Sequence, residues 1–362
     1  MSSAVLSSSP AASSSRASSM DYAAPRWLPG GNLQTIWAAL YARRFDGPAP
    51  VYRRERWTTP DGDFVDVDFV DAPASASVAR PPLLVLFHGL EGSSRSHYAE
   101  AFAAFAASRG MAFAVPHFRG CSGELNLAPR AYHSGDFEEI GWILARMREQ
   151  HVLRGGGPVL AAGVSLGGNA LMRWASEAGD TAARTVSAVA SVCAPLDLAA
   201  GGDAIGRGFN RLVYTRMFLQ TMKPKALAKL AQFPGLFDRD RLLAARDLYT
   251  FDDVFTAPLH GFRDTEDYWA RGSAKPHLDR IRVPALVVNA RNDPFIPARS
   301  LPRPGEVGAH VTLWQPGQGG HVGFPMGPPP AHVRAMPEQV GDWLQVHGGA
   351  LADGAGARPA RE

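Results

Sequence analysis

The stretch that decides the fold is LAAGVSLGGNA, residues 160–170. Glycines surround one serine here, between an apolar, strand-like run and a helical pattern, although glycine is unfavourable inside either element. Gly163 and Gly167 flank Ser165 in the arrangement typical of a nucleophile elbow, a turn so tight that backbone must approach backbone and the serine hydroxyl projects. An open alternative is a glycine-rich strand-to-helix turn in which Ser165 only caps the helix.

Short apolar runs alternate with helical patterns on both sides of this turn. Runs that are apolar on both faces suit strands inside a parallel sheet. The alternation predicts an α/β fold with a mostly parallel central sheet and helices on both faces. An antiparallel hairpin is expected from an Asp-Gly turn between two strand-like segments. The hairpin strands are 51–57 and 64–70, the later strands 83–89, 111–118, 158–165, 185–195, 284–293 and 310–317, and the helices 97–110, 136–150, 169–179 and 337–348.

The domain organisation follows from length and local composition. A chain of 362 residues can bury one large core. The first 20 residues hold ten serines and no acidic residue, so we expect a disordered tail over 1–20 and another over 347–362. Residues 21–346 are expected to form a single domain. A helical cap, or lid, is expected within it at about 197–278.

Composition and motifs exclude several functions. The net charge is only +3 and four of the 37 basic residues are lysines, which disfavours nucleic-acid binding. Cys121 and Cys193 are too few for a disulfide framework, so a reducing, cytoplasmic setting is expected. The chain lacks the glycine signatures of dinucleotide and phosphate loops and the H-E-x-x-H metal motif, so no cofactor and no metal are expected.

An acid and a base follow the elbow in the order that a serine nucleophile of this fold requires. Asp293 comes directly after an apolar strand in PALVVNARNDPF, and His321 follows the next strand in a glycine-rich loop, LWQPGQGGHVGF. We therefore expect Ser165, Asp293 and His321 to form a catalytic triad. Asp197, one strand earlier, is the alternative acid.

An oxyanion hole requires two donors beside the serine. One is expected to be the backbone N–H of Leu166, at the start of the helix that follows the elbow, where the helix dipole favours negative charge. The other is assigned to the N–H of Leu90, in the loop after the strand LLVLFHG. His88 in the same loop is expected to stabilise the loop rather than to act in catalysis.

The predicted cap contains apolar residues and a cluster of lysines. Met217, Phe218, Met222 and Phe233 are candidate walls of an acyl pocket, although each can equally be an ordinary packing residue of a helix. Three lysines at positions 223, 225 and 229 suggest a basic helix face, which can make transient contact with an anionic membrane surface.

Eight strings give a more specific result than the elbow alone. The sequence resembles the YheT-like branch of the α/β-hydrolase superfamily over about residues 25–346. One departure is Asn292, where relatives often carry a second aspartate, but Asp293 keeps the position before the proline. The strings are PRWLPGGNLQTI, HGLEGSSRSHY, HFRGCSGELN, YHSGDFEE, GVSLGGNAL, DDVFTAPLHGF, ARNDPFIP and GGHVGF.

The resemblance implies a serine esterase or lipase-like enzyme with Ser165, Asp293 and His321 as its triad. Its substrates would be small acyl esters of short to medium chain length, or acylglycerol-type lipids. Acyl transfer to an alcohol and a non-catalytic binding role are the alternatives. The H-x-x-x-x-D string associated with some acyltransferase relatives is absent, which favours water as the acceptor. The sequence assigns neither an oligomeric state nor a role to the Arg119-Gly120-Cys121-Ser122 loop, although Cys121 has no partner base.

Overall fold

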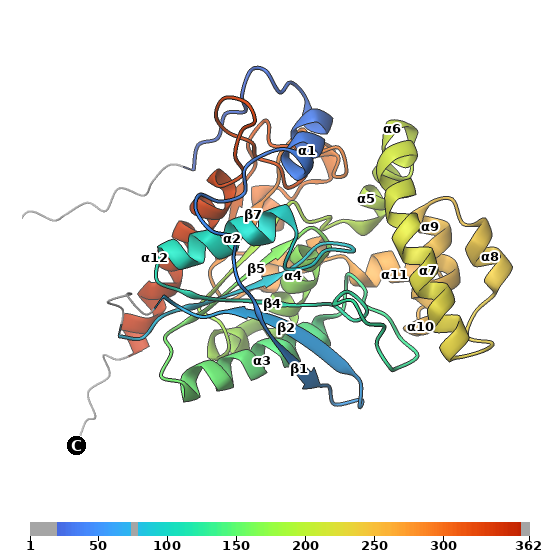
Figure 1. Cartoon of the computed structure of the whole chain (residues 1–362), viewed down its shortest axis with the longest axis horizontal. Coiled ribbons are helices and arrows are strands. Elements are labelled where there is room, and N and C mark those ends of the chain that lie inside the picture. The colour runs from blue at the N-terminus through green and yellow to red at the C-terminus, as the bar shows by residue number, and fades with distance from the viewer. Residues whose placement is uncertain (1–19, 74–78, 356–362) are drawn as a thin grey trace, which may run out of the picture.

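The computed structural model describes residues 20–73 and 79–355, which build one eight-stranded sheet with helices on both sides (Figure 1). The strand order is β1-β2-β4-β3-β5-β6-β7-β8. Pairing of β1 with β2 and of β2 with β4 is antiparallel, and the remaining pairs are parallel. The strands are β1 Arg53–Thr58, β2 Phe64–Val70, β3 Leu83–Phe87, β4 Ala112–Pro116, β5 Val159–Val164, β6 Ala188–Val192, β7 Ala285–Val288 and β8 Val311–Trp314.

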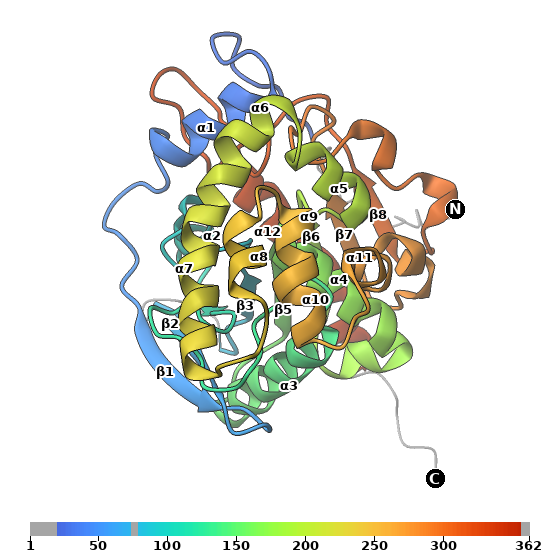
Figure 2. The same ribbon diagram turned by 90° about the vertical axis from the view of Figure 1, so that its right-hand side faces the viewer.

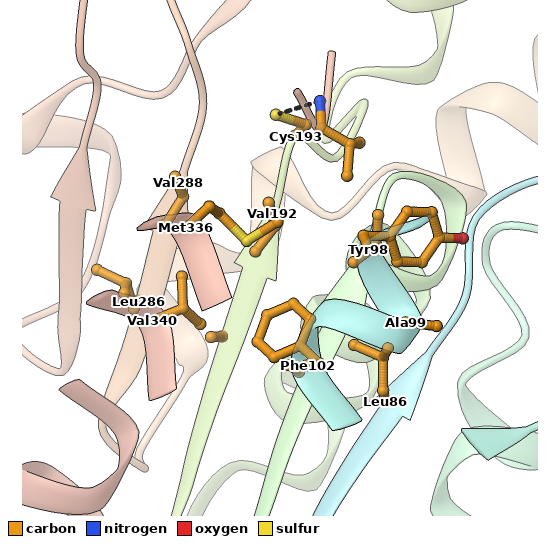
Figure 3. Packing of buried hydrophobic residues seen from close by; sticks show 14 of the residues in the cluster. Leu86, Tyr98, Ala99, Phe102, Val192, Cys193, Leu286, Val288, Met336 and Val340 are labelled. Atoms are coloured by element: carbon orange, nitrogen blue, oxygen red, sulfur yellow. Dashed lines mark hydrogen bonds between the residues drawn. The ribbon is translucent and has the colours of Figure 1, made fainter. Parts of the chain in front are cut away.

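The central strands are apolar on both faces because each face is covered by helices. Leu84 and Leu86 of β3 pack in one hydrophobic cluster with helices α2 (His97–Ser108) and α12 (Ala335–Ala355). Figure 3 shows part of this cluster, with Phe102 of α2 and Met336 of α12 on either side of Val192. The alternate residues of β3 pack on the other face with α3 (Phe137–Leu153) and α4 (Leu166–Ala178). This arrangement confirms the predicted α/β fold and its mixed sheet.

Helix α12 is longer than the sequence suggested. It continues through Ala355, so residues 347–355, expected to lie in an unstructured tail, are helical. Gly348 lets this part of the helix pack closely on β5, because a Cβ there would lie 2.4 Å from Leu160 Cδ2. The expected tail residues 1–19 and 356–362 lie outside the described part of the chain.

The helices between β6 and β7 form a separate layer over one edge of the sheet, and we call residues 197–278 the cap. In Figure 2 the cap helices lie in front of strands β3, β5 and β6. They have a small hydrophobic cluster of their own that includes Leu219, Phe251 and Phe255. The cap helices are α5 Leu198–Ile205, α6 Gly208–Asn210, α7 Arg216–Gln232, α8 Arg239–Ala244, α9 Leu248–Phe251, α10 Ala257–Leu259 and α11 Thr265–Gly272, with π-helical turns at Arg211–Thr215 and Asp252–Thr256.

Candidate active site

Ser165 occupies the turn between β5 and α4, in a left-handed conformation with φ 53° and ψ −120°. The glycines on either side of it leave no room for a side chain. A Cβ on Gly163 would lie 2.4 Å from the Gly167 carbonyl oxygen, and one on Gly167 would lie 2.5 Å from the carbonyl oxygen of His88. Ser165 makes no side-chain cap bond to α4, unlike the helix-capping alternative. The hydroxyl therefore projects from the turn.

The structure brings Ser165, His321 and Asp293 together. His321 Nε2 lies 3.1 Å from Ser165 Oγ, and His321 Nδ1 lies 2.9 Å from Asp293 Oδ2. The other Asp293 oxygen accepts a hydrogen bond from the Phe295 amide. Asp197 does not join this chain of contacts, because its carboxylate caps α5 by accepting from the Ala200 amide. With Nδ1 protonated, His321 donates to the carboxylate and can accept the Ser165 proton at Nε2.

The loops that carry Asp293 and His321 are held by helix α1 (Gly31–Leu40). Thr35 Oγ1 accepts from the His321 amide at 2.8 Å. Gln34 Oε1 accepts from both the Gly319 amide and Asn292 Nδ2. Asn292 Oδ1 in turn accepts from the Gly320 amide. Asn292, at the position where relatives often carry a second aspartate, is therefore part of the same hydrogen-bond network as Gln34. Gln34, Thr35 and Asn292 lie in the motif strings quoted above. The sequence does not show, however, that these strings meet in space.

The two amides assigned to an oxyanion hole belong to Leu90 and Leu166, residues at the same cavity as Ser165. The amides on either side of Leu90 are already used, since Gly89 N donates to Tyr98 Oη at 2.8 Å and Glu91 N donates to Tyr132 Oη at 3.0 Å. Within the described residues, neither the Leu90 nor the Leu166 amide has a protein acceptor. Both can therefore donate to a bound molecule.

His88 has the structural role expected for it. Its ring is fully buried, contacts the Gly89 carbonyl through Nδ1 and accepts from the Phe118 amide at Nε2. Burial, with a smaller contribution from His117, lowers the pKa of His88 to about 3, so the ring is neutral.

The Arg119 loop also proves to be structural. Arg119 is buried among carboxylates of Asp61, Asp63 and Glu139 and ties the β1–β2 turn to helix α3. Burial raises the pKa of the Cys121 thiol to about 12, which makes it a poor nucleophile. No signal in the sequence could have shown these three partners, because they come from distant segments.

A mainly apolar cavity opens between Ser165 and the cap. Of the four expected wall residues, Phe218 and Met222 line it. Met217 instead lines a neighbouring hollow that also reaches Ser165 and His321, and Phe233 is not a wall of either one. Besides Leu90 and Leu166, the other apolar walls of the cavity are Pro195, Leu198, Ile205, Leu248, Tyr268, Trp269, Phe295 and Ile296.

Two of the three lysines expected to form a basic face of α7 are directed inward instead. Lys229 is 1% exposed, and its ammonium donates to the carbonyl oxygens of Asn126 and Ala128. Lys225 points toward the sheet edge and pairs with Glu91 at 2.9 Å. The sequence correctly placed the three lysines on one helix. The direction of each lysine side chain, however, depends on how the cap packs against the sheet.

A sequence profile of the family described as "alpha/beta hydrolase fold" matches residues 82–328. The chain belongs to the α/β-hydrolase family. This α/β hydrolase is 38% identical to "Putative esterase YheT" of Escherichia coli (strain K12), over 91% of its own length and 94% of the relative's. It is 28% identical to the mouse protein "Phospholipase ABHD3", over 84% and 75% of the two chains, and 27% identical to the human "Monoacylglycerol lipase ABHD2", over 82% and 72%.

Solved structures agree with the fold of this α/β hydrolase. The Pyrococcus furiosus esterase Pf2001 superposes with a TM-score of 0.51 at 14% identity, covering 85% of this chain and 99% of the other. The esterase- and phospholipase-like relatives support a hydrolase activity. Among the described residues, no helix combines the length and hydropathy needed to span a membrane.

Proposed function

We propose that this α/β hydrolase cleaves carboxylic esters through an acyl-enzyme on Ser165. The observation that carries the proposal is the continuous contact from Ser165 through His321 to Asp293 at the wall of an apolar cavity. A serine hydroxyl is a weak nucleophile, and a base oriented by a carboxylate is what activates it.

The proposed reaction has two halves. His321 accepts the Ser165 proton as the oxygen attacks the ester carbonyl, and the Leu90 and Leu166 amides bind the resulting oxyanion. The imidazolium then protonates the departing alcohol. In the second half, His321 takes a proton from water, which attacks the acyl-enzyme and releases the acid. Asp293 stays ionised and stabilises the imidazolium throughout.

The walls around Ser165 support the proposed substrate class. An acyl chain of short to medium length fits the apolar cavity that Phe218 and Met222 close on the cap side. The alcohol part would lie in the neighbouring hollow, which includes Met217 and the cations Arg44 and Arg95. Small acyl esters and acylglycerol-type lipids both match this division.

The experiment is hydrolysis of p-nitrophenyl esters from acetate to laurate by the wild type and Ser165→Ala. We expect kcat to fall by about 10⁴-fold or more in the variant, because the nucleophile is removed while the oxyanion hole remains. Circular dichroism checks that both proteins fold. Equal activity in the two proteins would refute the proposal, and transfer to an added alcohol in place of hydrolysis would redirect it to acyl transfer.

Transient contact with a membrane surface is a second part of the proposal, and of the three lysines expected to take part it keeps only Lys223. The outer side of the cap has a hollow lined by Arg211, Arg216, Lys223 and Arg246, beside the 73% exposed Leu212. Cations next to exposed apolar side chains favour an anionic lipid surface. Sedimentation with phosphatidylglycerol vesicles, but not with phosphatidylcholine vesicles, is the expected result. Equal binding to both vesicles, or binding to neither, would refute this contact.

A further inference from the structure

The backbone next to the proposed oxyanion donor Leu90 is strained. Glu91 has φ 56°, a left-handed conformation that costs a residue other than glycine or asparagine about 1 kcal/mol or more. Such a conformation persists only where neighbouring groups fix it. The peptide unit between Leu90 and Glu91 is oriented by this conformation. The Leu90 N–H belongs to the preceding peptide unit of the same short turn.

One phenol fixes Glu91 from two directions. Tyr132 Oη accepts from the Glu91 amide at 3.0 Å and donates to the Glu91 carboxylate at 2.9 Å. Tyr132 is itself immobilised, because its ring stacks on Phe118 with centroids 5.3 Å apart and an angle of 11° between the planes. Burial, followed by the nearby Cys121 and Glu91, raises the pKa of Tyr132 well above its usual range, so the phenol keeps the proton it donates.

The third contact of Glu91 comes from the cap. Lys225, on α7, places its ammonium 2.9 Å from the second carboxylate oxygen, and the Glu91 side chain is only 9% exposed. Among the described residues, no other basic side chain forms an ion pair with Glu91. A buried carboxylate without a counter-charge is costly, so loss of Lys225 would favour movement of Glu91 toward solvent.

We propose that Lys225 and Tyr132 are positioning residues that hold the Leu90 amide in the oxyanion hole through Glu91. The inference rests on the proposed role of Leu90 in ester hydrolysis. It couples the cap to the chemistry: when α7 is docked, Lys225 neutralises Glu91 and the turn keeps its strained form. When α7 moves away, the turn relaxes and the Leu90 N–H leaves its place beside Ser165.

Lys225→Met and Tyr132→Phe test this coupling with p-nitrophenyl butyrate as substrate. Each variant keeps the bulk of its side chain and loses only the polar group. We expect kcat to fall about tenfold in each, with KM changed less than about twofold, because a displaced donor affects the transition state more than substrate binding. The double variant should lose little more than either single one, since both act through Glu91. Lys225→Arg should restore most of the rate.

The matched control is Arg241→Met, which breaks another cap ion pair, between Arg241 of α8 and Asp253, that does not touch the Glu91 turn. It should leave kcat unchanged. Thermal unfolding checks that all variants fold. A wild-type kcat in both test variants, or a loss seen only in KM, would overturn the inference while Ser165-dependent hydrolysis by the wild type still stood. Absence of Ser165-dependent hydrolysis in the wild type would refute the proposed function and this inference together.

Discussion

The two walls of the cavity are built differently. On the sheet side, backbone packs on backbone, and a Cβ on Gly163 or Gly167 would meet main-chain atoms at 2.4–2.8 Å. On the cap side, large side chains such as Phe218 and Trp269 line the cavity, and the cap also has a small hydrophobic cluster of its own. The comparison suggests that the sheet edge fixes the positions of Ser165, Asp293 and His321, whereas side chains that the cap contributes to the cavity can change without moving these three residues. Lys225 is the cap residue through which we propose a link to the Leu90 turn.

The same chemical change on the two sides tests this division most strongly. Asp293→Asn should lower kcat about 10⁴-fold while the protein stays folded, because the amide favours the wrong tautomer of His321. Asp197→Asn, at the start of the first cap helix, should keep the wild-type rate and stability, since asparagine caps a helix as well as aspartate does. The measurement is ester hydrolysis by both variants. An inactive Asp197→Asn beside an active Asp293→Asn would move the acid to the cap side.

Adding one methyl group on each side probes the packing. Gly163→Ala should destabilise the protein by about 3 kcal/mol or more, because the new Cβ meets main-chain atoms that cannot move aside. Gly202→Ala in α5 places its Cβ 2.3 Å from the Trp269 ring, which is a side chain rather than main chain and can give way in part, so we expect a smaller loss of about 2 kcal/mol. Urea unfolding of the two variants measures the difference. A larger loss for Gly202→Ala would reverse the proposed contrast in rigidity.

The same division explains what the sequence could predict. The glycine spacing around Ser165 is a local pattern with a local steric cause, and the strands before Asp293 and His321 are continuous apolar runs. Parallel strands bring their carboxyl ends to one edge, so the three residues could be placed together before the structure was known. Gln34 and Thr35 could not be assigned, because their contacts span more than 250 residues of the chain.

The cap was less predictable for a physical reason. Its helices were expected, but the direction of each side chain depends on docking against the sheet edge rather than on helical periodicity. Lys225 and Lys229 illustrate this, because both turn toward the sheet edge and find partners there. Charged side chains are usually exposed, so a sequence with three nearby lysines favours a solvated face unless distant acceptors are known.

The smallest expected effect concerns a carboxyl group on the cap wall. Asp252 lines the cavity and accepts from Thr256 Oγ1 at 2.6 Å and Trp269 Nε1 at 2.9 Å. Within the described residues, no basic side chain forms an ion pair with it. Burial raises the pKa of Asp252 from 3.8 to about 6, although the two hydrogen bonds oppose this shift.

The sign of the pH dependence follows from that shift. Between about pH 4 and pH 6 the folded protein holds a proton on Asp252 that the unfolded chain has lost, so this group's contribution to stability falls as the pH rises through that range. Asp252→Asn cannot ionise. Its stability relative to the wild type should therefore increase from pH 4 to pH 6, by about 1–2 kcal/mol, and then level off. Urea unfolding of both proteins at several pH values measures the difference, and a flat difference would mean that Asp252 titrates as an ordinary carboxyl. A rising difference would show that burial on the cap wall keeps Asp252 protonated in the folded protein below about pH 6, where the same carboxyl group is ionised in the unfolded chain.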